Sequence, residues 1–197
     1  EQIEIRERNL RYGIRPYDGF SVGLFLDHRD NRARVHDSAK GADMLNLFAY
    51  TCGFSLAAAV GGAKTTTSVD VSAKNLEWGR TNFALNHIPL PGEDEAPAEP
   101  PPDRKHSFIR SDAMDYLRRA RRQEKLFDLI VIDPPSFAYG RGGSKKDFSI
   151  VSDLPDLIAA SADVLRPGGG MMVSTNYRKM SLRELKELVR KGAGRRR

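Results

Sequence analysis

Short apolar runs alternate with stretches of helical spacing along most of the chain. The runs rich in aliphatic and β-branched residues predict strands at residues 44–48, 65–69, 106–109, 127–132 and 170–174. The stretches around them predict helices at residues 28–40, 54–60, 72–86, 112–122, 152–165 and 181–190, with Ser72 as an N-cap. Strands and helices in alternation predict an α/β fold with a doubly wound, mostly parallel sheet that carries helices on both faces.

Two segments depart from this alternation. Residues 1–27 contain short β-like stretches separated by turn signals, which predict a small antiparallel β element ahead of a main domain at residues 28–197. Residues 89–103 are rich in proline and acidic side chains, which predicts a flexible surface loop. The glycine run at 167–170 is interpreted as a tight turn before the last strand, because no Gly-Lys-Ser or Gly-Lys-Thr follows it.

Composition narrows the class of protein. A chain of 197 residues with 40% hydrophobic content can bury the core of one domain, and no apolar run approaches the about 18 residues of a membrane span. The first residues lack a signal-peptide pattern, so we expect a cytoplasmic protein without a membrane partner. Cys52 is the single cysteine and the four histidines lack ligand spacing with it, so we expect neither a disulfide nor a metal site.

The net charge of +6 suits a partner that carries phosphates. Half of this excess comes from the basic residues 195–197, and such a tail is usually only solvated. Trp78, on the helix that follows the second strand, is interpreted as a packing residue, with stacking on a cofactor as the less favoured alternative. Charge and composition are therefore compatible with a nucleic-acid partner without establishing one.

Acidic residues follow consecutive strands of the predicted sheet. Asp70, Asp112 and Asp133 come after the second, third and fourth strands, and the turn 49–55 leads from the first strand into a helix. In a doubly wound sheet, ligands bind at the carboxyl ends of the strands, so these residues predict a ligand site there. For Asp112, capping of the following helix is an equally good explanation.

The loop that starts at Asp133 is the most informative of these segments. Pro134 and Pro135 fix φ near about −65° and have no N–H, so the carbonyls around them are held in place as acceptors. Phe137 adds an aromatic side chain at the end of the loop. A rigid loop with a carboxylate and an aromatic ring suits a pocket for a flat nucleobase, and a plain surface turn is the alternative.

Together these segments resemble a known family. The similarity is carried by Asn46-Leu47-Phe48-Ala49-Tyr50-Thr51, Val69-Asp70-Val71-Ser72, Ser111-Asp112-Ala113, Asp133-Pro134-Pro135-Ser136-Phe137 and Gly23-Leu24-Phe25-Leu26-Asp27-His28-Arg29. It is to the class I S-adenosylmethionine-dependent methyltransferases of Rossmann-like fold, and more narrowly to the large-subunit ribosomal RNA methyltransferases of the guanine-7 and cytosine-5 group. It extends over most of residues 9–180.

The resemblance implies S-adenosylmethionine as cofactor, RNA as partner and a role for each matching residue. Tyr50, Thr51 and Gly53 would belong to the cofactor-binding turn, with Asp70 on the ribose, Asp112 and Ala113 at the adenine, and Asp27 and Arg29 closing the pocket. Asp133 would face both the cofactor and the reacting centre, where Pro134, Pro135 and Phe137 would position the base. The family's turn usually reads Thr-Gly-Gly, and Cys52 occupies the middle position here.

The chemistry of the target base separates the two branches of that group. Methylation of the five-carbon of cytosine requires a thiolate nucleophile, whereas guanine nitrogen 7 already carries a lone pair. The last strand ends in residues 174–176, Ser-Thr-Asn, without a thiol, and Cys52 in the cofactor turn is assigned a packing role. We therefore favour guanine. A cytosine-5 methyltransferase-like protein, an RNA-binding module without catalysis and a nicotinamide-dependent oxidoreductase remain alternatives.

Overall fold

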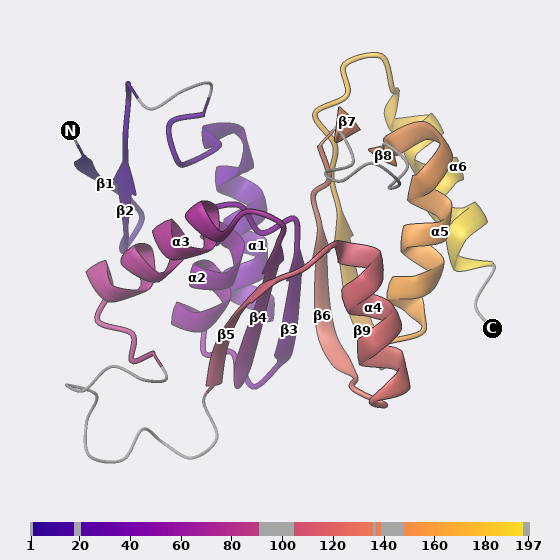
Figure 1. Cartoon of the computed structure of the whole chain (residues 1–197), viewed down its shortest axis with the longest axis horizontal. Coiled ribbons are helices and arrows are strands. Elements are labelled where there is room, and N and C mark those ends of the chain that lie inside the picture. Colours follow the sequence, from indigo (N-terminus) through magenta and orange to yellow (C-terminus); the bar gives the residue numbers. More distant parts are fainter. Residues whose placement is uncertain (1, 18–20, 91–104, 136, 139–147, 195–197) are drawn as a thin grey trace.

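The computed structural model describes residues 2–17, 21–90, 105–135, 137–138 and 148–194, with the backbone alone at 105, 137, 138 and 148. Its main sheet has the strand order β5-β4-β3-β6-β9, and every neighbouring pair is parallel (Figure 1). The strands are β3 (Asp43–Leu47), β4 (Thr65–Asp70), β5 (Lys105–Arg110), β6 (Phe127–Ile132) and β9 (Leu165–Val173). The predicted α/β class with a parallel sheet is confirmed.

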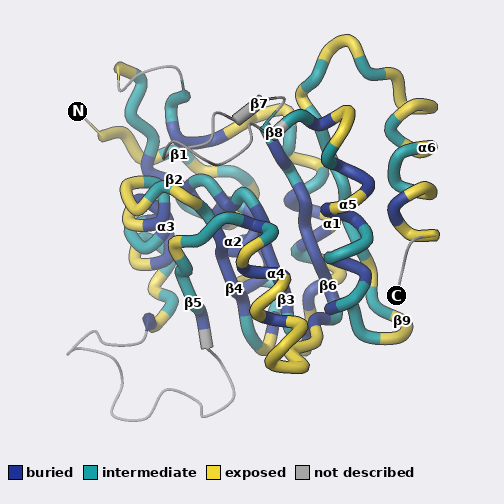
Figure 2. The backbone as a smooth tube through the Cα atoms, turned by 45° about the vertical axis from the view of Figure 1, so that its right-hand side comes forward, coloured by how far each residue is buried: buried dark blue, intermediate teal, exposed yellow. Residues whose placement is uncertain are grey.

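Helices cover both faces of this sheet (Figure 1). One face carries α1 (Arg29–Ser38), α2 (Gly53–Val60) and α3 (Ala73–Leu85), and the other carries α4 (Ala113–Arg122), α5 (Ile150–Ala162) and α6 (Leu182–Ala193). The central strands β3 and β6 are buried over nearly their whole length, and apolar residues make up most of both strands (Figure 2).

The first residues form the predicted antiparallel element. Strand β1 (Ile3–Glu7) pairs with β2 (Leu10–Ile14), and a short 3₁₀ turn, η1 (Leu26–His28), leads into α1. Tyr12 and Leu24 share a buried apolar cluster with residues of α2 and α3, so this hairpin packs directly against the main sheet domain. The division of the chain at residue 27 stays a prediction.

Most expected helices and strands agree with the structure to within about two residues. Ser72 caps α3 by accepting a hydrogen bond from the Asn75 N–H at 3.2 Å, as expected. Residues 91–104, most of the proline-rich loop predicted at 89–103, lie outside the described part of the chain. The short strands β7 (Phe137–Ala138) and β8 (Phe148–Ser149) form a further antiparallel pair that was not expected.

Two expectations about the last strand and the helix before it were wrong. The helix predicted to end at residue 165 ends at Ala162, and the glycine run 167–170 is part of β9 rather than a turn before it. Phe127 pairs with Leu165 and Leu129 with Gly170, so β9 holds extra residues between these pairs. Gly168 has φ +81°, a conformation open to glycine, and this irregularity lets the strand start early and rejoin β6.

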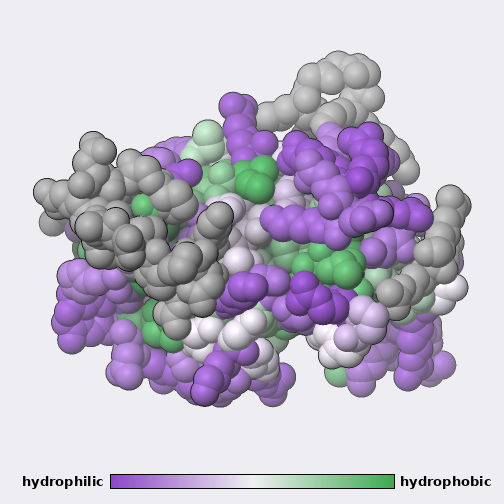
Figure 3. Space-filling model, turned by 90° about the horizontal axis from the view of Figure 1, so that it is seen from below, coloured by the Kyte–Doolittle hydropathy of each residue, from purple (hydrophilic) through white to green (hydrophobic). Residues whose placement is uncertain are grey.

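The end of the sheet at which the strands begin is largely hydrophilic, with smaller apolar patches between the polar side chains (Figure 3). Within the described ranges, no helix is long and apolar enough to span a membrane.

Candidate active site

The strand register brings the predicted site residues to one edge of the sheet. Leu47 pairs with Val69 and Ile132, and Ile132 pairs with Val173, so β3, β4, β6 and β9 finish side by side. Strand β5 joins the same edge through its parallel pairing with β4. The residues that follow each strand therefore meet at this edge, as parallel topology requires.

The turn between β3 and α2 has an unusual backbone. Phe48, Tyr50 and Cys52 have φ values of 59°, 48° and 62°, in the left-handed region that non-glycine residues seldom occupy. Such conformations concentrate at functional sites, where surrounding contacts hold them in place. No described side chain caps α2, so the N–H groups of its first turn are left for a ligand. The apolar sequence gives no sign of this backbone.

Asp70 joins this turn to the end of β4. Its Oδ2 accepts a hydrogen bond from the Tyr50 N–H at 2.9 Å, and its Oδ1 accepts one from the Ser72 N–H at 2.8 Å. Burial raises the pKa of the Asp70 carboxyl, and the N–H groups of Ser72 and Tyr50 partly offset that rise. The Asn75 side chain and the Val71 N–H add to this offset, so the Asp70 carboxylate is an acceptor surrounded by donors at the end of β4.

The side chains of the turn mainly hold the preceding N-terminal segment. The Thr51 hydroxyl donates to the Gly23 carbonyl at 2.6 Å, and the Tyr50 hydroxyl donates to the Ser21 carbonyl at 3.2 Å. A side chain at Gly53 would meet Leu24 at 3.4 Å, so this position also faces the N-terminal segment. The side chain of Thr51 and the open side of Gly53 are therefore turned toward this segment, and their contact with a cofactor stays a prediction.

Asp112 caps α4. Its Oδ1 accepts hydrogen bonds from the N–H groups of Met114 at 2.9 Å and Asp115 at 3.1 Å, which confirms the capping interpretation. Ala113, the first residue of the helix, is buried. The Ser111 N–H donates to the Asp70 carbonyl at 3.0 Å and ties this segment to the end of β4. Contact of Asp112 and Ala113 with an adenine stays a prediction.

Asp133, at the end of β6, is held from two directions. The Ser174 hydroxyl donates to Asp133 Oδ1 at 2.6 Å, and Nε2 of His28 lies 3.4 Å from Asp133 Oδ2. The Asp133 side chain is 20% exposed, so it can still meet a substrate. Pro134 beside it is buried and Pro135 is half-buried. The backbone of Phe137 lies in β7, and its side chain is outside the described part of the structure.

Asp27 and Arg29, which were predicted to close the pocket, are exposed and flank His28 in the chain. Because His28 lies against Asp133, both residues belong to a segment that passes next to the end of β6. Sequence reasoning did not identify His28 as a site residue. The only available signal was its position between Asp27 and Arg29.

Cys52 and Trp78 are packing residues, as expected. Cys52 is fully buried against Gly79, and burial raises the pKa of its thiol to about 12. Trp78 is 4% exposed, and its indole N–H donates to the Gly13 carbonyl at 2.7 Å. A thiol in this state remains protonated at neutral pH and does not act as a nucleophile.

Two buried polar residues that sequence reasoning missed attach the N-terminal hairpin to the site. Asn82 accepts a hydrogen bond from the Gly13 N–H at 2.9 Å and donates one to the Thr51 carbonyl at 3.0 Å. Arg32 is 3% exposed, pairs through two nitrogens with Glu7, and donates to the Phe25 carbonyl at 2.8 Å. Buried polar groups in such bonds fix the hairpin and the segment before α1 relative to the cofactor turn.

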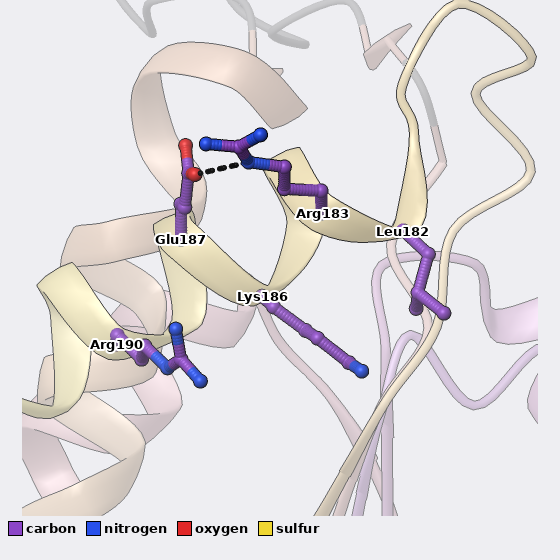
Figure 4. A pocket seen from close by; sticks show the side chains of 5 residues that line it. All are labelled: Leu182, Arg183, Lys186, Glu187 and Arg190. Atoms are coloured by element: carbon purple, nitrogen blue, oxygen red, sulfur yellow. Dashed lines mark hydrogen bonds and ion pairs between the residues drawn. The ribbon is translucent and has the colours of Figure 1, made fainter.

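Two surface hollows lie away from these residues. One is on α6 and is lined by Leu182, Arg183, Lys186, Glu187 and Arg190 (Figure 4). The other lies near the start of β9, around Arg166 and the residues 167–172. Neither lining includes a predicted site residue, and the described side chains contain no group of three His, Cys, Asp or Glu placed to hold a metal ion.

Comparison with known proteins gives a consistent result. A family model described as S-adenosylmethionine-dependent methyltransferase matches residues 1–193. The chain is 38% identical over 182 residues to the ribosomal RNA large subunit methyltransferase K/L of Saccharophagus degradans, covering 92% of this chain and 22% of that protein. The protein of that name from Syntrophotalea carbinolica is 36% identical over 190 residues, which cover 95% of this chain and 24% of that protein. The chain thus spans about a fifth to a quarter of these relatives.

Solved structures agree in fold. A methyltransferase in complex with SAH superposes with a TM-score of 0.86 at 35% identity, covering 100% of this chain and 48% of that one. A methyltransferase from Streptococcus mutans superposes with a TM-score of 0.84 at 34% identity, covering 100% of this chain and 47% of that one. A methyltransferase from Agrobacterium tumefaciens superposes with a TM-score of 0.81 at 26% identity, covering 98% of this chain and 58% of that one.

Proposed function

Since the chain belongs to the S-adenosylmethionine-dependent methyltransferase family, whose model covers residues 1–193, we propose that it methylates a guanine of large-subunit ribosomal RNA. The cofactor is S-adenosylmethionine, which supplies a methyl group activated on a sulfonium. The names of the relatives favour this RNA as the substrate. The single observation that carries the choice of guanine is the state of the chain's only thiol, Cys52.

The residues at the strand ends fit the cofactor chemically. The open N–H groups at the start of α2, with Thr51 and Gly53, suit the carboxylate of the methionine part. Asp70 has acceptor capacity for the ribose hydroxyls, and Asp112 with Ala113 lies next along the edge for the adenine. Tyr50 belongs to the same turn, and Asp27 and Arg29 would complete the site from the N-terminal side.

Cytosine and guanine make different demands on the protein. Attack through the five-carbon of cytosine needs a thiolate, yet Cys52 is buried and its pKa is raised to about 12. Strand β9 is followed by Ser174, which is hydrogen-bonded to Asp133, at the place where cytosine-modifying members of the group that the sequence resembles use a cysteine. A guanine ring nitrogen needs positioning and a suitable electrostatic environment instead, with nitrogen 7 as the preferred atom.

Asp133 and its loop are suited to position such a base. An ionised carboxylate accepts hydrogen bonds from the N–H groups on one edge of guanine, and the Pro134 and Pro135 carbonyls add further acceptors. Phe137 would stack on the base once it has left the RNA helix. The chain's net charge of +6 favours contact with the RNA phosphates, and we place the reaction in the cytoplasm.

The proposal is tested with isotopically labelled S-adenosylmethionine and an unmodified transcript of large-subunit ribosomal RNA. We expect transfer of label by the unaltered chain and a loss of about 100-fold or more in Asp133→Ala, the size typical of removing a group that acts in the transition state. Asp37→Ala, which changes an exposed carboxylate on α1, is the matched control and should transfer normally.

Two results would contradict the proposal. RNA binding without transfer by the unaltered chain would favour the non-catalytic RNA-binding alternative. Undiminished transfer by Asp133→Ala would remove Asp133 from the reaction.

A further inference from the structure

We propose that His28 is a positioning residue for Asp133 in methyl transfer, an inference that rests on the proposed function. His28 Nε2 lies 3.4 Å from Asp133 Oδ2, and the two side chains are 12% and 20% exposed. They are brought together from η1 at the start of the chain and from the end of β6. This contact connects the N-terminal segment directly to the carboxylate at the reacting centre.

The His28 ring is itself fixed from two sides. Asn31 Nδ2 lies 3.1 Å from His28 Nδ1, and the ring meets Phe54 edge-on, with centroids 5.4 Å apart and an interplanar angle of 69°. Asn31 is one turn further along α1, and Phe54 is in the first turn of α2. The imidazole is therefore packed between two helices and is directed at β6.

These contacts define which nitrogen of His28 carries the proton. An amide nitrogen is a donor only, so the Asn31 contact makes Nδ1 of His28 the acceptor. The proton of the neutral ring then sits on Nε2, on the side of Asp133. His28 accordingly has the N–H of Nε2 on the side of Asp133 Oδ2, with the nitrogen 3.4 Å from that oxygen.

Ser174 and His28 lie against different oxygens of Asp133. Ser174 donates to Oδ1 at 2.6 Å, and His28 faces Oδ2 at 3.4 Å. A carboxylate held at both oxygens keeps one orientation, and that orientation decides which donors of a bound base it can meet. The His28 contact is a close approach of the two side chains rather than a formed hydrogen bond, and catalytic contacts of this kind often tighten once the reactants are bound.

The place of His28 in the chain adds a second consequence. Its neighbours Asp27 and Arg29 are the residues proposed to close the cofactor pocket. His28 therefore links the segment proposed to close the cofactor pocket with the carboxylate proposed to face the reacting centre.

The test compares His28→Ala, His28→Gln and His36→Ala by steady-state methyl transfer to the large-subunit ribosomal RNA transcript. His36 lies on α1, is paired with Asp37 and is exposed, so it is the matched control. We expect His28→Ala to lower kcat by about 10- to 100-fold, the loss expected for one hydrogen bond to a charged group, and to change KM for S-adenosylmethionine by less than about threefold. Gln retains an N–H at the place of Nε2, so His28→Gln should recover most of the rate.

A second measurement does not depend on turnover. In nitrogen-15 NMR spectra, the His28 ring should show the tautomer with the proton on Nε2, and Asp133→Asn should shift its signals while those of His36 stay in place. Equal kcat in His28→Ala and the unaltered chain, or no rescue by His28→Gln, would overturn the positioning role. A chain that transfers no methyl group to this RNA would overturn the proposed function and this role in it, whereas the ring signals would still show whether the pair forms.

Discussion

The carboxylate of Asp70 accepts a hydrogen bond from the backbone N–H of Tyr50, with Oδ2 and N 2.9 Å apart. This bond joins the end of β4 to the strained turn after β3, so the residue proposed to hold the cofactor ribose also supports the backbone beside it. We predict that Asp70→Ala weakens binding of S-adenosylmethionine by about tenfold or more, because both contributions are lost. Isothermal titration calorimetry measures the affinity for S-adenosylmethionine, with Asp37→Ala as the control. Equal affinities in the two variants would exclude Asp70 as the residue that holds the ribose.

Asp70 also makes a testable contribution to the pH dependence of stability. Its pKa is raised in the folded protein, chiefly by burial, so between the ordinary carboxyl value and the raised one the folded state holds a proton that the unfolded state has lost. Stability from this group is complete below the ordinary value of 3.8 and is lost as the pH rises through the folded pKa. Relative to Asp70→Asn, the unaltered chain should therefore lose free energy of unfolding as the pH rises above about 4.

Urea unfolding at a series of acidic pH values, without cofactor, provides the measurement. Replacing one carboxylate oxygen by an amide also changes the free energy of unfolding by a constant amount. That amount is the same at every pH, so it does not affect how the difference between the two chains varies with pH. If the unaltered chain instead gained free energy of unfolding relative to Asp70→Asn as the pH rises, the assigned direction of the Asp70 pKa shift would be contradicted.

Asn82 makes a separate prediction about the N-terminal hairpin. Its amide is fully buried and joins the Gly13 N–H to the Thr51 carbonyl. Asn82→Ala leaves both groups unpaired and should lower the free energy of unfolding by about 2–4 kcal/mol. Thr81→Ala, on the neighbouring residue of α3, removes only a hydroxyl bonded to the Glu77 carbonyl within the helix and should cost less than about 1 kcal/mol. Similar losses in both variants would mean that Asn82 does not anchor the hairpin.

The parallel sheet could be predicted from the sequence because strand and helix periods are local properties. The strand-end acids followed from that topology, since parallel strands finish at one edge. The burial of Cys52 and Trp78 could also be predicted, because residues of these types usually lie inside a protein. These predictions needed no knowledge of which distant residues touch.

The rest depends on long-range contacts that no local pattern reveals. His28 meets Asp133, and Asn82 meets Gly13, across large separations in the chain. The backbone at Phe48, Tyr50 and Cys52 is left-handed although none of these residues is glycine, so the sequence does not indicate this conformation. The start of β9 was missed because a proline and glycine run ordinarily indicates a turn, whereas here it forms an irregularity within a strand.

The thiol of Cys52 should be unreactive in the folded chain. Burial raises its pKa from 9.0 to about 12, which lowers the thiolate fraction near neutral pH by roughly 1,000-fold. We therefore predict that a thiol reagent such as dithionitrobenzoate labels the folded protein at least about 100-fold more slowly than the urea-unfolded protein at about pH 8. Rapid labelling of the folded chain would reopen the assignment of Cys52 as a packing residue.

The identity of the methylated nucleoside tests the central claim most directly. Large-subunit ribosomal RNA labelled by the unaltered chain is digested to nucleosides, which are separated by chromatography and identified by mass spectrometry. The buried thiol predicts label in a methylguanosine. We prefer 7-methylguanosine, and 2-methylguanosine would retain guanine while moving the reaction to its amino group, whose hydrogens the Asp133 carboxylate can accept. Label in 5-methylcytidine would contradict the account, because that product requires a thiolate that this site does not provide.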